Sequence, residues 1–272
     1  MQRASRLGTL FVLVVVATVG AATAPGHLAA APVRVRAPEG SAHGFLVLRG
    51  TKAEVLAQGD WWQIPAGERL EVHLRFQFTD GSLSHETFVL TQRRVWTMLA
   101  YRSMQRGPSF PRDLDGRVDG ETGRYTVTTH DRDKGTIKVD EGQLDLPEDV
   151  YGFGMLAILL RNLEPGAGFA AHVLAFTPKP RILDLEVTPD GQDTVTIQGL
   201  PRKTSRYLAT AKLGGVLGAA ASIAGKQPPP LHYWLAGDPL PSFVRFDGPF
   251  YSDAPIWRVE LAAPHWTDDT RR

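Results

Sequence analysis

The stretch LEVHLRFQFTDGSLSHETFVLTQ, residues 70–92, carries the clearest secondary-structure signal in the chain. Apolar side chains occupy every second position of its first half, at Val72, Leu74, Phe76 and Phe78. Because successive side chains of a strand point to opposite faces of the sheet, this period of two predicts a half-buried strand. The Asp80-Gly81 pair that follows suits a tight type I′ turn, so a second strand should run back to residue 92.

The length of that turn fixes which side chains share a face. A two-residue turn would place Arg75 opposite Glu86 on the solvent face, and His85 opposite Phe76 on the apolar face. We therefore predict that Glu86 faces water and that His85 faces the interior.

Strand-like segments recur along most of the remaining chain. A second hairpin is predicted between residues 182–187 and 194–197, with its turn at 189–191 in the motif Pro-Asp-Gly. Further strand candidates are residues 44–50, 94–104, 123–130, 135–141, 169–178, 206–213, 231–237, 242–248 and 256–264. Strand-helix-strand alternation is almost absent, so we predict a mainly all-β fold. A strongly curved antiparallel meander, a barrel, a half-open barrel or a sandwich would protect the sheet edges.

Two segments depart from the strand pattern. Residues 147–166 have helical spacing of apolar side chains, which predicts one short helix of about 12 residues. The stretch AKLGGVLGAAASIAGKQPPP, residues 211–230, is rich in glycine and alanine. It fails the phosphate-loop pattern, because Ala220 replaces the required glycine and Gln227 follows Lys226. We expect no nucleotide there, but a short packed helix or an apolar lip over a cavity.

The N-terminus has the pattern of a secretory signal peptide. Arg3 and Arg6 precede an apolar run at 10–19, and small residues follow. We expect an exported protein, periplasmic or extracellular, which stays anchored by its N-terminus if the signal is kept. The chain has 0 cysteines, so a packed core rather than disulfides must stabilise it. The predicted divisions are a signal peptide at 1–22 (cleavage up to about 31), an extended linker at 23–42, a single β-rich domain at 43–266 and a polar tail at 267–272.

Charge and motifs give little sign of catalysis. The formal net charge is +1 with both signs dispersed, which does not indicate nucleic-acid binding. The sequence has no nucleophile elbow and no zinc-binding His pair, so we predict no catalytic residue, metal or cofactor. Whether the protein is an enzyme stays open at this point. An acid/base hydrolase that uses Asp145, Glu148 and Asp149 is one alternative.

Several motifs resemble those of one family. They are RGPSFPRDLDG, LDLPEDVYG, FTPKPRILDLEV, the run from Lys212 to Tyr251, and PIWRVELAAPHW. With these motifs the chain resembles a group of exported bacterial proteins of unknown function. It is more loosely similar to periplasmic β-rich domains whose half-barrels resemble lipoprotein carriers. The resemblance implies export and a curved β fold, and it transfers no catalytic residue.

Together these features favour non-enzymatic binding of an apolar or lipid-like molecule in the cell envelope. The tryptophans can line a cavity, and the apolar lip would form its mouth. The predicted ligand-binding residues are Gly214, Gly215, Leu217, Ile223, Lys226 and Trp234. Lys226 would meet an anionic head group. The other alternative is an envelope scaffold module that docks a protein partner on an exposed face.

Overall fold

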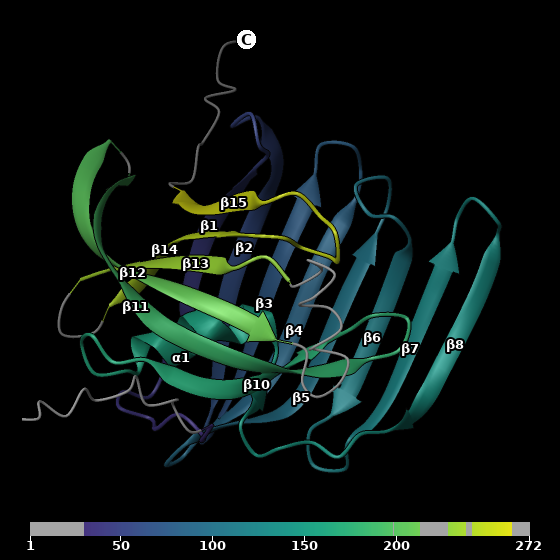
Figure 1. Cartoon of the computed structure of the whole chain (residues 1–272), viewed down its shortest axis with the longest axis horizontal. Coiled ribbons are helices and arrows are strands. Elements are labelled where there is room, and N and C mark those ends of the chain that lie inside the picture. The colour runs from purple at the N-terminus through teal and green to yellow at the C-terminus, as the bar shows by residue number, and fades with distance from the viewer. Residues whose placement is uncertain (1–29, 198, 213–227, 238–240, 263–272) are drawn as a thin grey trace, which may run out of the picture.

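A single sheet dominates the computed structural model, which describes residues 30–197, 199–212, 228–237 and 241–262 (Figure 1). Its first eight strands are β1 (Ala42–Arg49), β2 (Val55–Ala66), β3 (Arg69–Phe78), β4 (Leu83–Gln92), β5 (Trp96–Arg106), β6 (Asp113–Asp119), β7 (Arg124–Asp131) and β8 (Thr136–Gln143). The others are β9 (Val150–Tyr151), β10 (Phe169–Ala175), β11 (Arg181–Ile197), β12 (Leu200–Lys212), β13 (Leu231–Ala236), β14 (Ser242–Gly248) and β15 (Trp257–Ala262). Within the described residues, the helical elements are the 3₁₀ turn η1 (Phe153–Met155) and the helix α1 (Leu156–Arg161).

The strand order joins two meanders at one seam. Across the 15-stranded sheet it runs β8-β7-β6-β5-β4-β3-β2-β1-β15-β14-β13-β12-β11-β10-β9. Neighbouring strands are antiparallel except for β9 and β10, which pair in parallel. The seam is the β1–β15 ladder, in which Leu48 lies opposite Val259. The mainly all-β, strongly curved antiparallel fold that the sequence predicts is therefore confirmed.

The curved part of the sheet runs from β9 to β5. Side chains and the N-terminal segment connect these two ends, which are not hydrogen-bonded neighbours in the strand order. The Tyr151 hydroxyl on β9 donates to the carbonyl of Trp96 on β5 over 2.9 Å. Residues 30–35 lie between these ends, since the Trp96 N–H donates to Val33 O and the Ala31 N–H donates to Ala170 O. Residues in the predicted linker thus pack on the sheet. Strands β6 to β8 continue beyond this junction (Figure 1).

The main hydrophobic core fills the concave side of the sheet. Side chains of η1 and α1 pack there against inward-facing residues of strands from both meanders. Its largest fully buried members include Trp96, Tyr151, Phe88, Leu156 and Leu159. Without disulfides, burial of this apolar surface supplies the main driving force for folding.

The helix is shorter than the pattern predicts. Only Leu156–Arg161 is α-helical, and η1 precedes it. Residues 150 and 151 pair with β10 instead, and Gly152 and Gly154 lie where the first helical turn was expected. Glycine disfavours the helix interior by about 1 kcal/mol relative to alanine, so this sequence starts the helix late.

The second predicted hairpin is wrong. Residues 181–197 form one strand that pairs with β12 along most of its length, and a bulge lies between Pro189 and Gln192. Gly191 adopts a φ of +92° at this bulge. Glycine with positive φ serves bulges as well as turns, so the Pro-Asp-Gly signal bends the strand here without reversing it.

Within the described residues, no helix has the length and apolar character that crossing a bilayer requires. The predicted signal peptide and polar tail lie outside the described residues.

A candidate ligand-binding cavity

A cavity of about 360 Å³ lies between the concave face of the sheet and the η1–α1 segment. Strands β1 to β5 form one wall, and β13 to β15 form the other. The two meanders therefore build the cavity jointly, on both sides of the β1–β15 seam.

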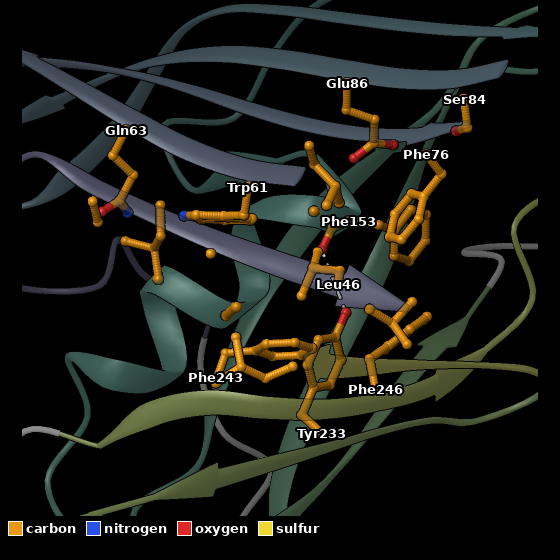
Figure 2. Close-up of a pocket in the computed structure, with 18 of the residues that line it drawn as sticks. Leu46, Trp61, Gln63, Phe76, Ser84, Glu86, Phe153, Tyr233, Phe243 and Phe246 are labelled. Carbon is orange, nitrogen blue, oxygen red and sulfur yellow. Dashed lines mark hydrogen bonds between the residues drawn. The ribbon is translucent and has the colours of Figure 1, made fainter. Parts of the chain in front are cut away.

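Aromatic side chains dominate the cavity wall (Figure 2). Those labelled there are Trp61, Phe76, Phe153, Tyr233, Phe243 and Phe246. The rings of Tyr233 and Phe246 lie 4.9 Å apart between centroids. The Tyr233 hydroxyl donates to the carbonyl of Phe153 over 3.4 Å, which ties β13 to η1. Such a wall offers large apolar contact area with few polar groups.

Glu86 faces this cavity, contrary to the sequence prediction. The β3–β4 loop has three residues, 79–81, because the Phe78 N–H pairs with Ser82 O and Gly81 adopts a φ of +86°. The register consequently slips by one, so Glu86 lies opposite Leu74 and His85 lies opposite Arg75. A one-residue slip exchanges the two faces of a strand. The carboxylate of Glu86 therefore points inward, toward Phe153 and Phe76 (Figure 2).

Three neutral groups hydrogen-bond the Glu86 carboxylate. The Tyr101 hydroxyl donates to its Oε1 over 2.9 Å, and the Ser103 hydroxyl and the Gly154 N–H also bond to it. Burial raises the pKa of Glu86, and these hydrogen bonds offset only part of that effect. Burial and the neighbouring Glu86 charge raise the pKa of Tyr101 well above its usual value.

Gly154 permits the close approach of η1 to Glu86. A Cβ at this position would overlap Glu86 Oε2 and would lie 3.0 Å from the Phe88 ring. A side chain at residue 154 would therefore displace the Glu86 carboxylate, whereas glycine lets the backbone N–H come within bonding distance of it.

A second polar group lies at another part of the cavity wall. The guanidinium of Arg161 on α1 pairs with the carboxylate of Glu39 over 2.8 Å. Burial raises the pKa of Glu39, and Arg161 opposes that shift. The backbone N–H of Glu39 donates to Gln92 Oε1 over 2.7 Å, which fixes this part of the N-terminal segment on β4. Sequence reasoning missed this pair, because Glu39 falls in the predicted linker.

The predicted site residues fall into two groups. Gly214, Gly215, Leu217, Ile223 and Lys226 lie outside the described residues. Trp234 is described, and the structure places it on the opposite face of β13 from the cavity-lining Tyr233. There its indole N–H donates to Asp193 Oδ2, and the guanidinium of Arg245 lies 4.2 Å from its ring centroid. Among the tryptophans of the described residues, Trp61 lines the cavity and Trp234 does not.

The acids of the hydrolase alternative do not line the cavity. Asp149 is buried and pairs with His172 over 2.8 Å, whereas Asp145 and Glu148 are exposed. In the described part of the chain, no group of three or more His, Asp or Glu side chains could hold a metal ion.

Fold and site together define a curved all-β protein with a partly open, mainly apolar cavity on the concave side of its sheet. No protein-family model matches the chain, and no curated protein matches it. Among solved structures, it is similar to a β-barrel-like protein of the domain of unknown function DUF1849 from Brucella abortus. The two share 11% sequence identity with a TM-score of 0.41, over 89% of this chain and 100% of that chain.

Proposed function

We propose that the protein binds a small, mainly apolar molecule inside its curved sheet without transforming it, and that it does so in the cell envelope. The observation that carries the proposal is the cavity of about 360 Å³ with its aromatic wall. Ligand sites typically enclose roughly 300–1,000 Å³ and are lined by apolar and aromatic side chains with a few polar groups. The signal-like N-terminal sequence supports export.

Volume restricts the size of the ligand. A dry apolar cavity of about 150 Å³ accommodates benzene, which has six non-hydrogen atoms. Scaled to 360 Å³, the same packing accommodates roughly a dozen to fifteen such atoms. A single short chain or a small ring system fits this space, whereas a complete two-chain lipid does not.

The test is a calorimetric titration with 2-naphthol, a neutral and mainly apolar probe that is small enough for this volume. We expect saturable binding, which Ala157→Phe should weaken at least tenfold because residue 157 lines the cavity. Ala66→Phe is the matched control, since Ala66 is exposed at the end of β2. Equal binding by both variants and the unaltered protein would refute the cavity as the binding site.

One observation favours the scaffold alternative. Ile137 and Val139 lie two apart on β8, an edge strand of the described sheet, and they are 68% and 59% exposed. Exposed edge strands with apolar side chains can add a strand from another chain. The double variant Ile137→Lys, Val139→Lys should abolish capture of an envelope protein partner by crosslinking while it leaves probe binding intact. A partner that is captured equally by both forms would exclude β8 as the docking surface.

A further inference from the structure

The acidic and basic side chains that line the cavity do not balance in charge. Within the described residues these are Glu39, His43, Glu86 and Arg161. Arg161 is bound to Glu39, and His43 Nε2 lies 3.2 Å from Asp60 Oδ1. Glu86 is left with neutral partners only. The basic side chains of the cavity therefore already have acidic partners, and the Glu86 carboxylate has no positive partner.

The groups around Glu86 are arranged for its ionised form. The backbone N–H of Gly154 can only donate, and the Tyr101 hydroxyl is oriented to donate over 2.9 Å. Donors that converge on one carboxyl group favour the carboxylate over the neutral acid. Burial opposes ionisation, however, because a buried charge without a counter-charge is costly. A cation that entered the cavity would remove that cost.

Aromatic side chains of the same cavity also suit a cation. Trp61 lies on β2 and Phe153 on η1, and both side chains line the cavity with Glu86 (Figure 2). Aromatic faces attract ammonium groups through the ring quadrupole, and more strongly when the site is desolvated. Anionic ligands would meet the negative charge of Glu86 instead.

We infer that the cavity selects an organic cation, in which a primary or substituted ammonium lies against Glu86 and an apolar body of about ten non-hydrogen atoms fills the aromatic part. The inference rests on the proposed function, because it names the chemistry of the molecule that the cavity binds. The carboxylate supplies charge-assisted hydrogen bonds, and the aromatic wall supplies contact area.

Binding of such a cation depends on pH. The titratable groups that face Glu86 are Tyr101 from β5 and Tyr233 from β13. Burial and the charge of Glu86 raise the pKa of both tyrosines, so both are neutral near pH 7. Burial also raises the pKa of Glu86 above 4.5. Affinity for an ammonium should therefore rise with pH through the pKa of Glu86.

Three probes of matched length test the inference by calorimetric titration: octylammonium, 1-octanol and octanoate. Above the pKa of Glu86, octylammonium should bind about tenfold or more tightly than 1-octanol, since a charge-assisted hydrogen bond contributes at least that factor. Octanoate should bind weakest of the three. Between about pH 4 and about pH 8, affinity for octylammonium should increase while affinity for 1-octanol does not.

Variants assign the selectivity to one residue. Glu86→Gln keeps the size of the side chain and should reduce the preference for octylammonium to within about threefold of 1-octanol. Retained 1-octanol binding shows that this variant is folded. Glu121→Gln, which removes an exposed carboxylate in the β6–β7 turn, should keep the full preference.

The outcomes separate the two proposals. If none of the three probes binds, the proposed apolar-ligand function fails. If 1-octanol binds as tightly as octylammonium, or if the preference survives in Glu86→Gln, the cation inference is overturned while the apolar cavity function stands.

Discussion

Substitution of Gly154 by alanine should destabilise the protein through Glu86. The new Cβ would overlap Glu86 Oε2, so the carboxylate must shift and lose its bond from the Gly154 N–H. Overpacking costs about 1–3 kcal/mol, and a hydrogen bond to a charged group contributes about 1.5–3 kcal/mol. We therefore expect the free energy of unfolding to fall by about 3 kcal/mol.

The effect should depend on what occupies residue 86. In a Glu86→Ala background the overlap disappears and only the 3.0 Å contact with Phe88 remains, so Gly154→Ala should cost about 1 kcal/mol or less. In a Glu86→Gln background the side chain keeps its size, and the cost should stay within about 1 kcal/mol of that in the unaltered protein.

Urea denaturation of the resulting double-mutant cycle measures this coupling directly. A coupling energy of about 2 kcal/mol between Gly154→Ala and Glu86→Ala is the expected result. If the two substitutions add to within about 0.5 kcal/mol, the close approach of η1 to the carboxylate is not what requires glycine at residue 154.

Three further substitutions test other groups. Because the folded pKa of Glu86 is raised above 4.5, its contribution to stability is fully present below pH 4.5 and is lost as pH rises through the folded pKa. Glu86→Gln should remove this fall in the free energy of unfolding, measured across pH. A fall of the same size in the variant would show that Glu86 is not its cause. Burial disfavours the charge of Asp247, but hydrogen bonds from Arg245 and Arg258 outweigh it and lower its pKa. Asp247→Asn should therefore cost about 2 kcal/mol near pH 7 and progressively less as pH falls through the folded pKa, whereas a pH-independent cost would argue against the ion pairs. Tyr151→Phe should cost about 1–2 kcal/mol and speed amide exchange in the N-terminal segment at 30–35, and protection as in the unaltered protein would show that the hydroxyl does not hold β9 against β5.

The fold class could be predicted because each strand carries its own alternating pattern. The prediction missed β2 and β6, where the pattern is interrupted. In β2, Trp61 and Trp62 are adjacent and both partly buried, one on each face of the sheet. In β6 the middle one of three inward positions is Gly116, between Leu114 and Val118, and the Phe176 ring of another segment occupies the space of its missing side chain. Packing by a distant residue leaves no trace in the local sequence.

The site was harder to predict than the fold. Asp80-Gly81 fits both a two-residue turn and a three-residue loop that ends in glycine. The difference of one residue in loop length decides which face of the sheet Glu86 occupies. The cavity itself is lined by residues from Glu39 to Leu261, and the β1–β15 seam brings the strands that carry them together. No local pattern marks such a set.

The seam also determines how the chain can be divided. Residues 42–143 form consecutive hairpins on one side of it, and the strands of the other side, β9 to β15, lie between residues 150 and 262. A cut in the connection between β8 and β9, at residues 144–149, would therefore give two polypeptides whose strand ladders meet only at β1 and β15. Because each fragment carries half of the cavity wall, reassembly of the split protein and recovery of ligand binding should occur as one bimolecular event, at a rate proportional to fragment concentration.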